Sequence, residues 1–169
     1  EHATADDKNL GKSLQLTPTG REQFDKLVNS TVPTTATLDK VNAPVDADTG
    51  GLILGLTESV ISKSGNVKQE KDASGKVVGL VPQGFEITIY QKNVDIAMSD
   101  ISKGDGGDIY GKDVPKGSIN FSQLIGVIFG HEIEHATPKD LLHGYKNPSK
   151  AEEPATNISN KIIDELIKK

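Results

Sequence analysis

The chain contains no cysteine and no tryptophan, and aromatic residues make up only 4% of its 169 residues. The missing cysteines exclude a disulfide scaffold and any thiolate metal site. A metal ion would therefore have to be held by His, Asp or Glu side chains. Because aromatics are few, we expect a hydrophobic core made mainly of Leu, Ile and Val.

Long apolar runs and an excess of positive charge are also missing. The longest apolar run extends from Leu124 to Phe129, far short of the roughly 20 residues that span a bilayer, so we expect no membrane span. The formal net charge is -5, and no basic stripe with interleaved aromatics occurs. This composition argues against nucleic acid as a partner.

The length of the chain is typical of one domain. Residues 1–16 are mostly polar, and we interpret them as a flexible lead-in without a function of its own. Residues 17–169 are then interpreted as the single folded domain.

Hydrophobic periodicity separates helical from extended segments. Apolar residues at helical spacing predict a helix over 19–29, whereas 31–51 and 102–118, rich in Gly, Asp, Pro or Thr, predict loops. Short β-prone runs, one of which alternates between apolar and polar residues, predict a small, curled, mostly antiparallel sheet and hence an α+β fold. The predicted strands cover 52–56, 77–81 and 85–90.

The most informative segment is INFSQLIGVIFGHEIEHAT, residues 119–137. Its dense apolar residues predict a helix that Ser118 or Asn120 caps and that Pro138 ends. Such a helix is buried on most sides, so the two histidines and two glutamates in its last turns need partners. A bound cation would supply them.

The residues His131, Glu132 and His135 form an HExxH pattern. Two histidines four residues apart lie on one helical face and can bind one ion. In this pattern the histidines bind zinc and the glutamate acts as general base of a metallopeptidase. Glu134 lies equally far from the histidine face on its other side, so angular position alone does not identify the base. The alternative is a helix that buries one His and exposes the other.

A catalytic zinc site usually has three protein ligands and one open position. An extension to HExxHxxGxxH is excluded, because Pro138 and Leu141 stand where it needs Gly and His. The remaining choice is a carboxylate, Glu152 or Glu153, at the start of a C-terminal amphipathic helix expected to begin near Ala151. Helical register favours Glu152, since the residues three, seven and ten positions later continue the buried stripe.

Two segments, GHEIEHA at 130–136 and EEPATNISNKI at 152–162, resemble gluzincin-type zinc metallopeptidases. Among these they are similar to compact metallopeptidase domains at the C-termini of bacterial polymorphic toxins and effectors. The resemblance implies a zincin-like fold, with an active-site helix and a C-terminal helix that carries a ligand, and it selects Glu132 as the base. The implied Zn²⁺ ligands are His131, His135 and Glu152.

The resemblance also implies an activity and a setting. The reaction would be hydrolysis of peptide bonds by a zinc-bound water that Glu132 activates, with a protein or peptide as substrate. An immunity or inhibitor protein would be a partner, and the chain would be secreted or delivered by a secretion system as the C-terminal domain of a larger protein.

Several points stay open at this level. His143 and Tyr145 follow the HExxH helix closely enough to be donors to the developing oxyanion, or they are ordinary surface or packing residues. We expect a substrate to add as an extra strand along the edge of the sheet. Two other classes of function remain, namely a catalytically inactive zincin-fold binding protein and a zinc-stabilised structural domain.

Overall fold

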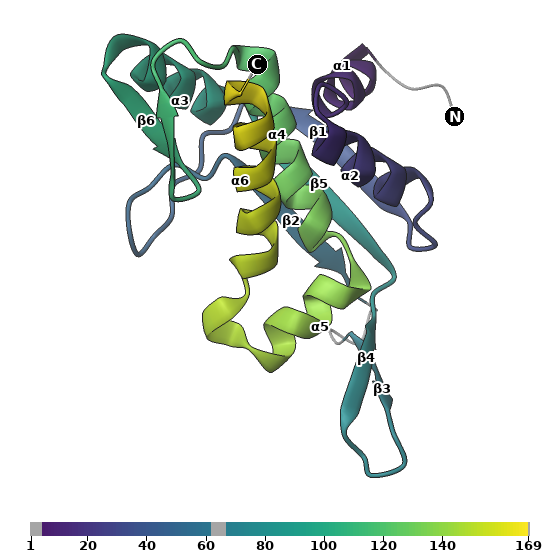
Figure 1. The fold of residues 1–169 in the computed structure, drawn as a ribbon. Helices are drawn as coiled ribbons and strands as arrows, with labels where there is room; N and C mark the ends of the chain where they lie inside the picture. Colours follow the sequence, from purple (N-terminus) through teal and green to yellow (C-terminus); the bar gives the residue numbers. More distant parts are fainter. Residues whose placement is uncertain (1–4, 62–66, 169) are drawn as a thin grey trace.

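A central apolar helix, α4 (Phe121–His135), organises the fold (Figure 1). The computed structural model describes residues 5–61 and 67–168. Leu124 and Val127 of α4 are fully buried, because helices and a sheet pack against this helix from several sides. The helix predicted over 119–137 is therefore confirmed, with slightly shorter bounds.

The start of α4 is fixed by a capping box. Asn120 accepts a hydrogen bond from the main-chain N–H of Gln123, and the Gln123 side chain accepts one from the main-chain N–H of Asn120. Of the two caps that the sequence allowed, the structure uses Asn120. At the other end the helix stops at His135, and Pro138 begins the next helix, α5 (Pro138–Lys146).

A three-stranded mixed sheet packs against α4. Its order is β1 (Thr34–Asp39), β5 (Gly84–Tyr90) and β2 (Gly55–Val60). Strand β1 is parallel to β5, and β2 is antiparallel to it. The residues of β5 alternate as the sequence predicted, with Phe85, Ile87 and Ile89 buried. Strand β2 forms one edge of this sheet in the described part of the chain.

Two predictions about this sheet were wrong in part. The predicted loop 31–51 contains β1, whose short polar and apolar residues form a strand because β5 supplies the pairing. The strand predicted over 52–56 begins only at Gly55, and Leu52 makes an isolated bridge to Val45. The other strand pairs of the described residues, β2–β5, β3–β4 and β6–β7, are antiparallel, so the expectation of a mostly antiparallel arrangement is confirmed, with the β1–β5 pair as a parallel exception.

Three further helices cover α4. Helix α6 (Glu153–Ile167) lies alongside it, and α1 (Ala5–Leu14) and α2 (Pro18–Val28) pack against it as well (Figure 1). The close approach of α6 depends on Gly130, where a Cβ atom would lie 2.5 Å from a methyl carbon of Ile162. Helix α2 agrees with the prediction over 19–29, and α6 with the predicted C-terminal helix.

Helix α1 corrects the interpretation of residues 1–16 as a flexible lead-in. Leu10 and Leu14, four residues apart, are buried in the main core. The segment is helical because these two side chains pack against α4, which its mostly polar composition did not reveal. Residues 1–4 lie outside the described part of the chain.

Two hairpins complete the molecule. The hairpin of β3 (Lys68–Lys71) and β4 (Val77–Val81) projects from the body, and β4 confirms the strand predicted there (Figure 1). Helix α3 (Gln91–Lys103) leads into the second hairpin, β6 (Gly106–Ile109) and β7 (Lys112–Pro115). This hairpin corrects the predicted loop 102–118. A short 3-10 turn, Pro148–Lys150, joins α5 to α6.

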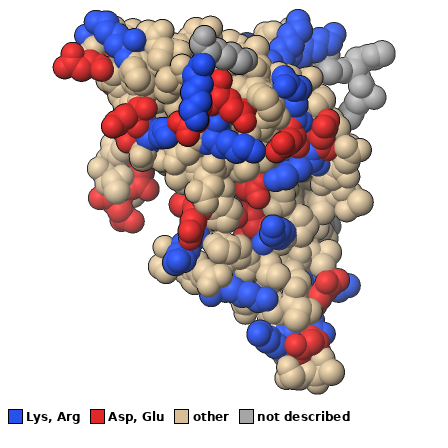
Figure 2. All heavy atoms as spheres, viewed as in Figure 1, with Lys and Arg blue, Asp and Glu red and all other residues tan. Residues whose placement is uncertain are grey.

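Two surface properties follow from these elements. None of the helices in the described residues is both long and apolar enough to cross a membrane. On the face drawn in Figure 2, Lys and Arg side chains alternate with Asp and Glu side chains. That face therefore carries no continuous stripe of one charge.

Candidate metal centre

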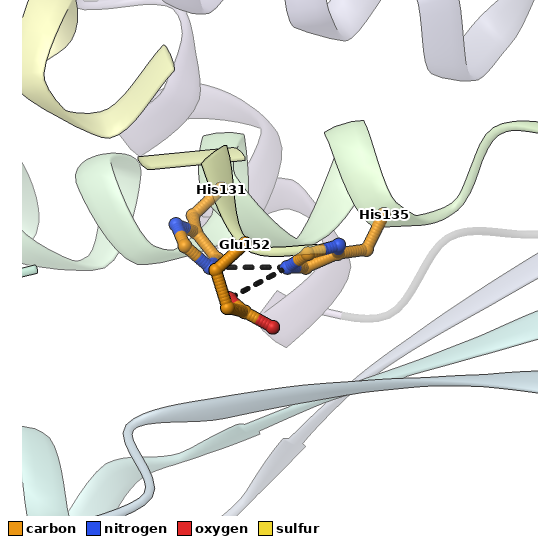
Figure 3. Close-up of side chains that lie close together, drawn as sticks. All are labelled: His131, His135 and Glu152. Carbon is orange, nitrogen blue, oxygen red and sulfur yellow. Dashed lines mark hydrogen bonds and ion pairs between the residues drawn. The ribbon is translucent and has the colours of Figure 1, made fainter. Parts of the chain in front are cut away.

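Three side chains from α4 and the start of α6 converge on one point. The Nε2 atoms of His131 and His135 are 3.2 Å apart, and the Glu152 Oε2 atom lies 3.3 Å from the first and 3.2 Å from the second. Figure 3 shows the three side chains turned toward one another. They form a group that could hold a metal ion within the described residues.

The distances suit zinc. Ligand atoms about 2.0–2.1 Å from a tetrahedral ion lie roughly 3.3–3.4 Å from one another. The three separations measured here are 3.2 to 3.3 Å, close to the edges of such a tetrahedron. Two imidazole nitrogens and one carboxylate oxygen are also donors that zinc accepts. The residues present therefore fit a zinc ion, which His131, His135 and Glu152 would hold.

The ring of His135 is held by a carboxylate from the next helix. Its Nδ1 lies 2.8 Å from Oδ2 of Asp140, a buried residue in the first turn of α5. Thr137 caps α5 by accepting from the N–H of Asp140, which turns this carboxylate back toward α4. When the ring is neutral, a proton on Nδ1 would donate to Asp140 and leave the lone pair of Nε2 directed at the centre.

The ring of His131 has a weaker partner. Its Nδ1 lies 3.5 Å from Oγ of Ser159 on α6. The Ser159 hydroxyl donates to the main-chain oxygen of Thr156, so it can accept from the imidazole N–H. This long contact favours the same arrangement as in His135, with Nε2 free to bind a cation.

The charges of the cluster shift the pKa values of its members. Burial lowers the pKa of His135, but hydrogen bonds with Asp140 and Glu152 outweigh burial and raise it to about 10. Hydrogen bonds with His131 and His135 hold the pKa of Glu152 well below its ordinary range. These opposite shifts favour a protonated His135 beside an ionised Glu152 when no metal ion is bound, and a cation that binds would displace that proton.

Glu132 and Glu134 point to different sides of α4. Glu132 lines the same cavity as the three converging residues and is 3% exposed. Glu134 instead pairs with Lys26 and accepts a hydrogen bond from Gln23, both on α2. Of the two glutamates, Glu132 is therefore the one that lies beside the candidate metal centre.

Burial sets the chemistry of Glu132. It raises the pKa of the carboxyl group, and the neighbouring His131 and a hydrogen bond from Thr57 offset part of this rise. A carboxylate with a raised pKa is a better proton acceptor near neutral pH than an exposed one.

The centre forms one wall of a large cavity of about 1290 Å³. Strand β2 forms another wall through Gly55, Leu56, Thr57 and Ser59, and the β3–β4 hairpin and α5 extend the cavity away from the centre. Glu152 is 73% exposed despite its contacts with both histidines. The centre is therefore reachable by a molecule of peptide size.

Tyr110 is a member of this wall that the sequence did not indicate. It stacks on the ring of His131, with ring centroids 3.8 Å apart and planes 6° apart. Its hydroxyl is buried and has no hydrogen-bond partner among the described residues. Burial, together with the charges of Glu132 and Glu152, raises the pKa of this hydroxyl well above its ordinary value, so it stays protonated.

The backbone at Tyr110 is as unusual as its side chain. Tyr110 and Gly111 form the two-residue turn between β6 and β7, with φ values of 53° and 75°. Asn and Gly are the residues that such a turn favours at its first position, and a bulky side chain there costs energy. The sequence around Tyr110 is typical of a Gly- and Asp-rich loop, and it contains no local pattern that would place this side chain at the cluster.

The remaining predicted site residues lie further out. His143 does not line the cavity, and its Nε2 lies 3.0 Å from the main-chain oxygen of Lys150. Tyr145 lines the cavity but is 53% exposed. Glu153 points to solvent beside Lys150 and is not in the cluster. Glu152, the residue favoured by register, is the one that reaches the histidines.

The chain matches no protein-family model, no curated protein and no solved structure. The resemblance to gluzincin-type peptidases therefore rests on residues 130–136 and 152–162 alone.

Proposed function

We propose that this protein is a zinc-dependent peptidase with a zincin-like fold. The observation that carries the proposal is the placement of His131, His135 and Glu152, whose ligand atoms lie 3.2 to 3.3 Å apart beside a large cavity. The buried carboxylate of Glu132 lines the same cavity. Together these residues supply the ligands and the base of metal-assisted hydrolysis.

His131, His135 and Glu152 would hold the ion. When bound, zinc supplies Lewis-acid chemistry, which activates water near neutral pH and polarises a carbonyl oxygen. Glu132 accepts the proton of the attacking water and returns it to the leaving amine. Burial raises the pKa of this carboxyl group, which makes it a better proton acceptor than an exposed glutamate.

The hydroxyl of Tyr110 is the donor that we assign to the carbonyl oxygen of the bond being cleaved. It belongs to a residue of the cavity wall, stays protonated and lacks another partner among the described residues, and because it has no exposed surface a bound substrate would have to displace the atoms that cover it. A preorganised donor of this kind stabilises charge that develops on the oxygen. The position of His143 outside the cavity wall speaks against that residue in this role.

Strand β2 provides a place for the substrate. It is an edge strand of the mixed sheet in the described residues, and it lines the cavity beside the metal centre. An extended peptide can add to such an edge through main-chain hydrogen bonds. The proposed substrate is therefore an extended segment of a protein or peptide.

Two features favour a catalytic over a structural zinc site. Structural zinc is usually held by four protein ligands in a closed site, whereas the cluster in the described residues has three. The third ligand, Glu152, is largely exposed to the cavity.

The test combines metal content with proteolysis. Chelator-free protein is assayed for zinc and for release of fluorescent peptides from fluorescein-labelled casein. We expect Glu132→Gln to keep its zinc and lose hydrolysis by roughly 100-fold or more. Glu134→Gln, a matched change two residues along the same helix, should cleave like the parent. Full activity of Glu132→Gln, or a parent without zinc under zinc-replete conditions, would refute the proposal.

A further inference from the structure

Thr57 on β2 makes a direct contact with the side chain of Glu132. Its Oγ1 atom lies 2.8 Å from Oε2 of Glu132 and 2.9 Å from the main-chain oxygen of the same residue. The hydroxyl has one proton, so it donates to one oxygen at a time, and an ionised carboxylate is the stronger acceptor. The main-chain oxygen already accepts the helical hydrogen bond from the N–H of Ala136.

Gly55 leaves room for the same carboxyl group. A Cβ atom at this position would lie 2.7 Å from Oε1, 2.8 Å from Cγ and 3.0 Å from Cδ of Glu132. Nonbonded carbon and oxygen atoms do not approach this closely without strain. The space that Glu132 occupies therefore exists because residue 55 has no side chain.

The two contacts come from one face of one strand. Gly55 and Thr57 are two residues apart, so both are directed to the same side of β2, and α4 packs against this strand. Nothing about a lone Gly or Thr in the sequence indicates this role, because it depends on how β2 and α4 are placed relative to each other.

We propose that Thr57 and Gly55 are positioning residues that hold the Glu132 carboxylate in place for proton transfer. This inference rests on the proposed function, in which Glu132 is the base. Since β2 is also the strand that we expect a peptide to join, one element would set the position of both the base and the bond to be cleaved.

The kinetic test uses Thr57→Val, which keeps the shape of the side chain and removes the hydroxyl. The substrate is a quenched fluorescent peptide that the zinc-loaded parent cleaves. We expect kcat to fall by roughly 10- to 100-fold, as for a misplaced catalytic group, while KM and zinc content stay as in the parent. Thr57→Ser should recover most of the lost kcat, because it restores the hydroxyl.

A matched control comes from the same sheet. Thr37 is an exposed threonine of β1, outside the cavity, and Thr37→Val should leave kcat unchanged. If Thr57 had only a structural role, Thr57→Val and Thr57→Ser would both lower the stability of the protein. Thr57→Ser would then not restore the kcat that Thr57→Val loses.

The second arm does not depend on activity. Crystal structures of the zinc-loaded parent, Thr57→Val and Gly55→Ala should show the Glu132 carboxylate displaced in both variants. A carboxylate that stays in place, or a Thr57→Val protein with the kcat of the parent, would overturn the inference. If the parent cleaves no peptide, the proposed function fails, and the crystal structures still decide whether these two residues hold Glu132.

Discussion

Tyr110 lies flat on His131, with ring centroids 3.8 Å apart and ring planes 6° apart. The contact joins the turn of the β6–β7 hairpin to the central helix. Rotation of the imidazole would break the stacking, so the contact helps to keep Nε2 directed toward Glu152. A strained backbone position is thus occupied by a side chain that touches a proposed ligand.

Two variants distinguish the effect of the Tyr110 ring from the effect of its hydroxyl. Tyr110→Phe keeps the stacking, so zinc affinity should stay near that of the parent while kcat falls by roughly 100-fold, as when an oxyanion donor is removed. Tyr110→Ala should lower both quantities, because His131 loses its stacked neighbour. Zinc affinity is measured by competition with a chromophoric chelator. Unchanged kcat in the Phe variant would exclude the hydroxyl as a donor.

Asp140 should matter for zinc although it is not a ligand. Replacing it with Asn weakens the acceptor that orients the His135 ring, so zinc affinity should fall by roughly 10- to 100-fold. Asp164→Asn is a suitable control, since Asp164 forms an ion pair with Lys112 of β7 and lies outside the cluster. Equal zinc affinity of the two variants would show that the His135 contact has no influence on binding.

The two neighbouring glutamates at the start of α6 give a direct test of the ligand set. Glu152→Gln removes a charged oxygen from the cluster, so the purified protein should contain little zinc. Glu153→Gln changes only an exposed side chain beside Lys150 and should retain the zinc content of the parent. Elemental analysis of both proteins decides between them, and loss of zinc in the second variant alone would reverse the assignment.

The metal-free protein should lose stability as pH rises above about 6.5. The pKa of His135 is raised from 6.5 to about 10, because hydrogen bonds with Asp140 and Glu152 outweigh the opposing effect of burial. A raised pKa means that the folded state binds the proton more tightly than the unfolded state. This stabilisation is complete below about pH 6.5 and disappears as pH approaches about 10.

Zinc should reverse that trend. A histidine ligand must be neutral, so binding displaces the proton and the gain in unfolding free energy from zinc should increase with pH. The unfolding free energy is measured by urea denaturation at several pH values, once with a chelator and once at a fixed free zinc concentration. The two dependences on pH are then compared. In His135→Gln the pH slope of the metal-free protein should be reduced. A metal-free protein whose stability rises over this range would contradict the assigned proton.

Local pattern was sufficient for several elements. The apolar residues of α4 and the alternation in β5 each indicate their structure within a few neighbouring positions, whereas the choice of Asn120 over Ser118 as the cap came from the structure. The helical register of the C-terminal segment was also informative. Ala155, Ser159 and Ile162, which follow Glu152 by three, seven and ten residues, are all buried. Such features are predictable because helical and strand periods are properties of the chain itself.

Other elements depended on partners distant in sequence. Strand β1 forms because β5 pairs with it, and α1 is ordered because Leu10 and Leu14 pack on α4. Propensity alone does not reveal either, since most of the stability of a short helix or strand comes from tertiary packing.

The sequence by itself determined the two histidines, the neighbouring glutamate and the helix that carries them, because a spacing of four residues places His131 and His135 on one face. Only the tertiary structure distinguished Glu132 from Glu134 and brought Glu152, Asp140, Tyr110 and Thr57 to the same centre. Those residues come from α6, α5, the β6–β7 turn and β2. Their meeting follows from the packing of these elements around α4, and packing at long range leaves no local period in the chain to detect.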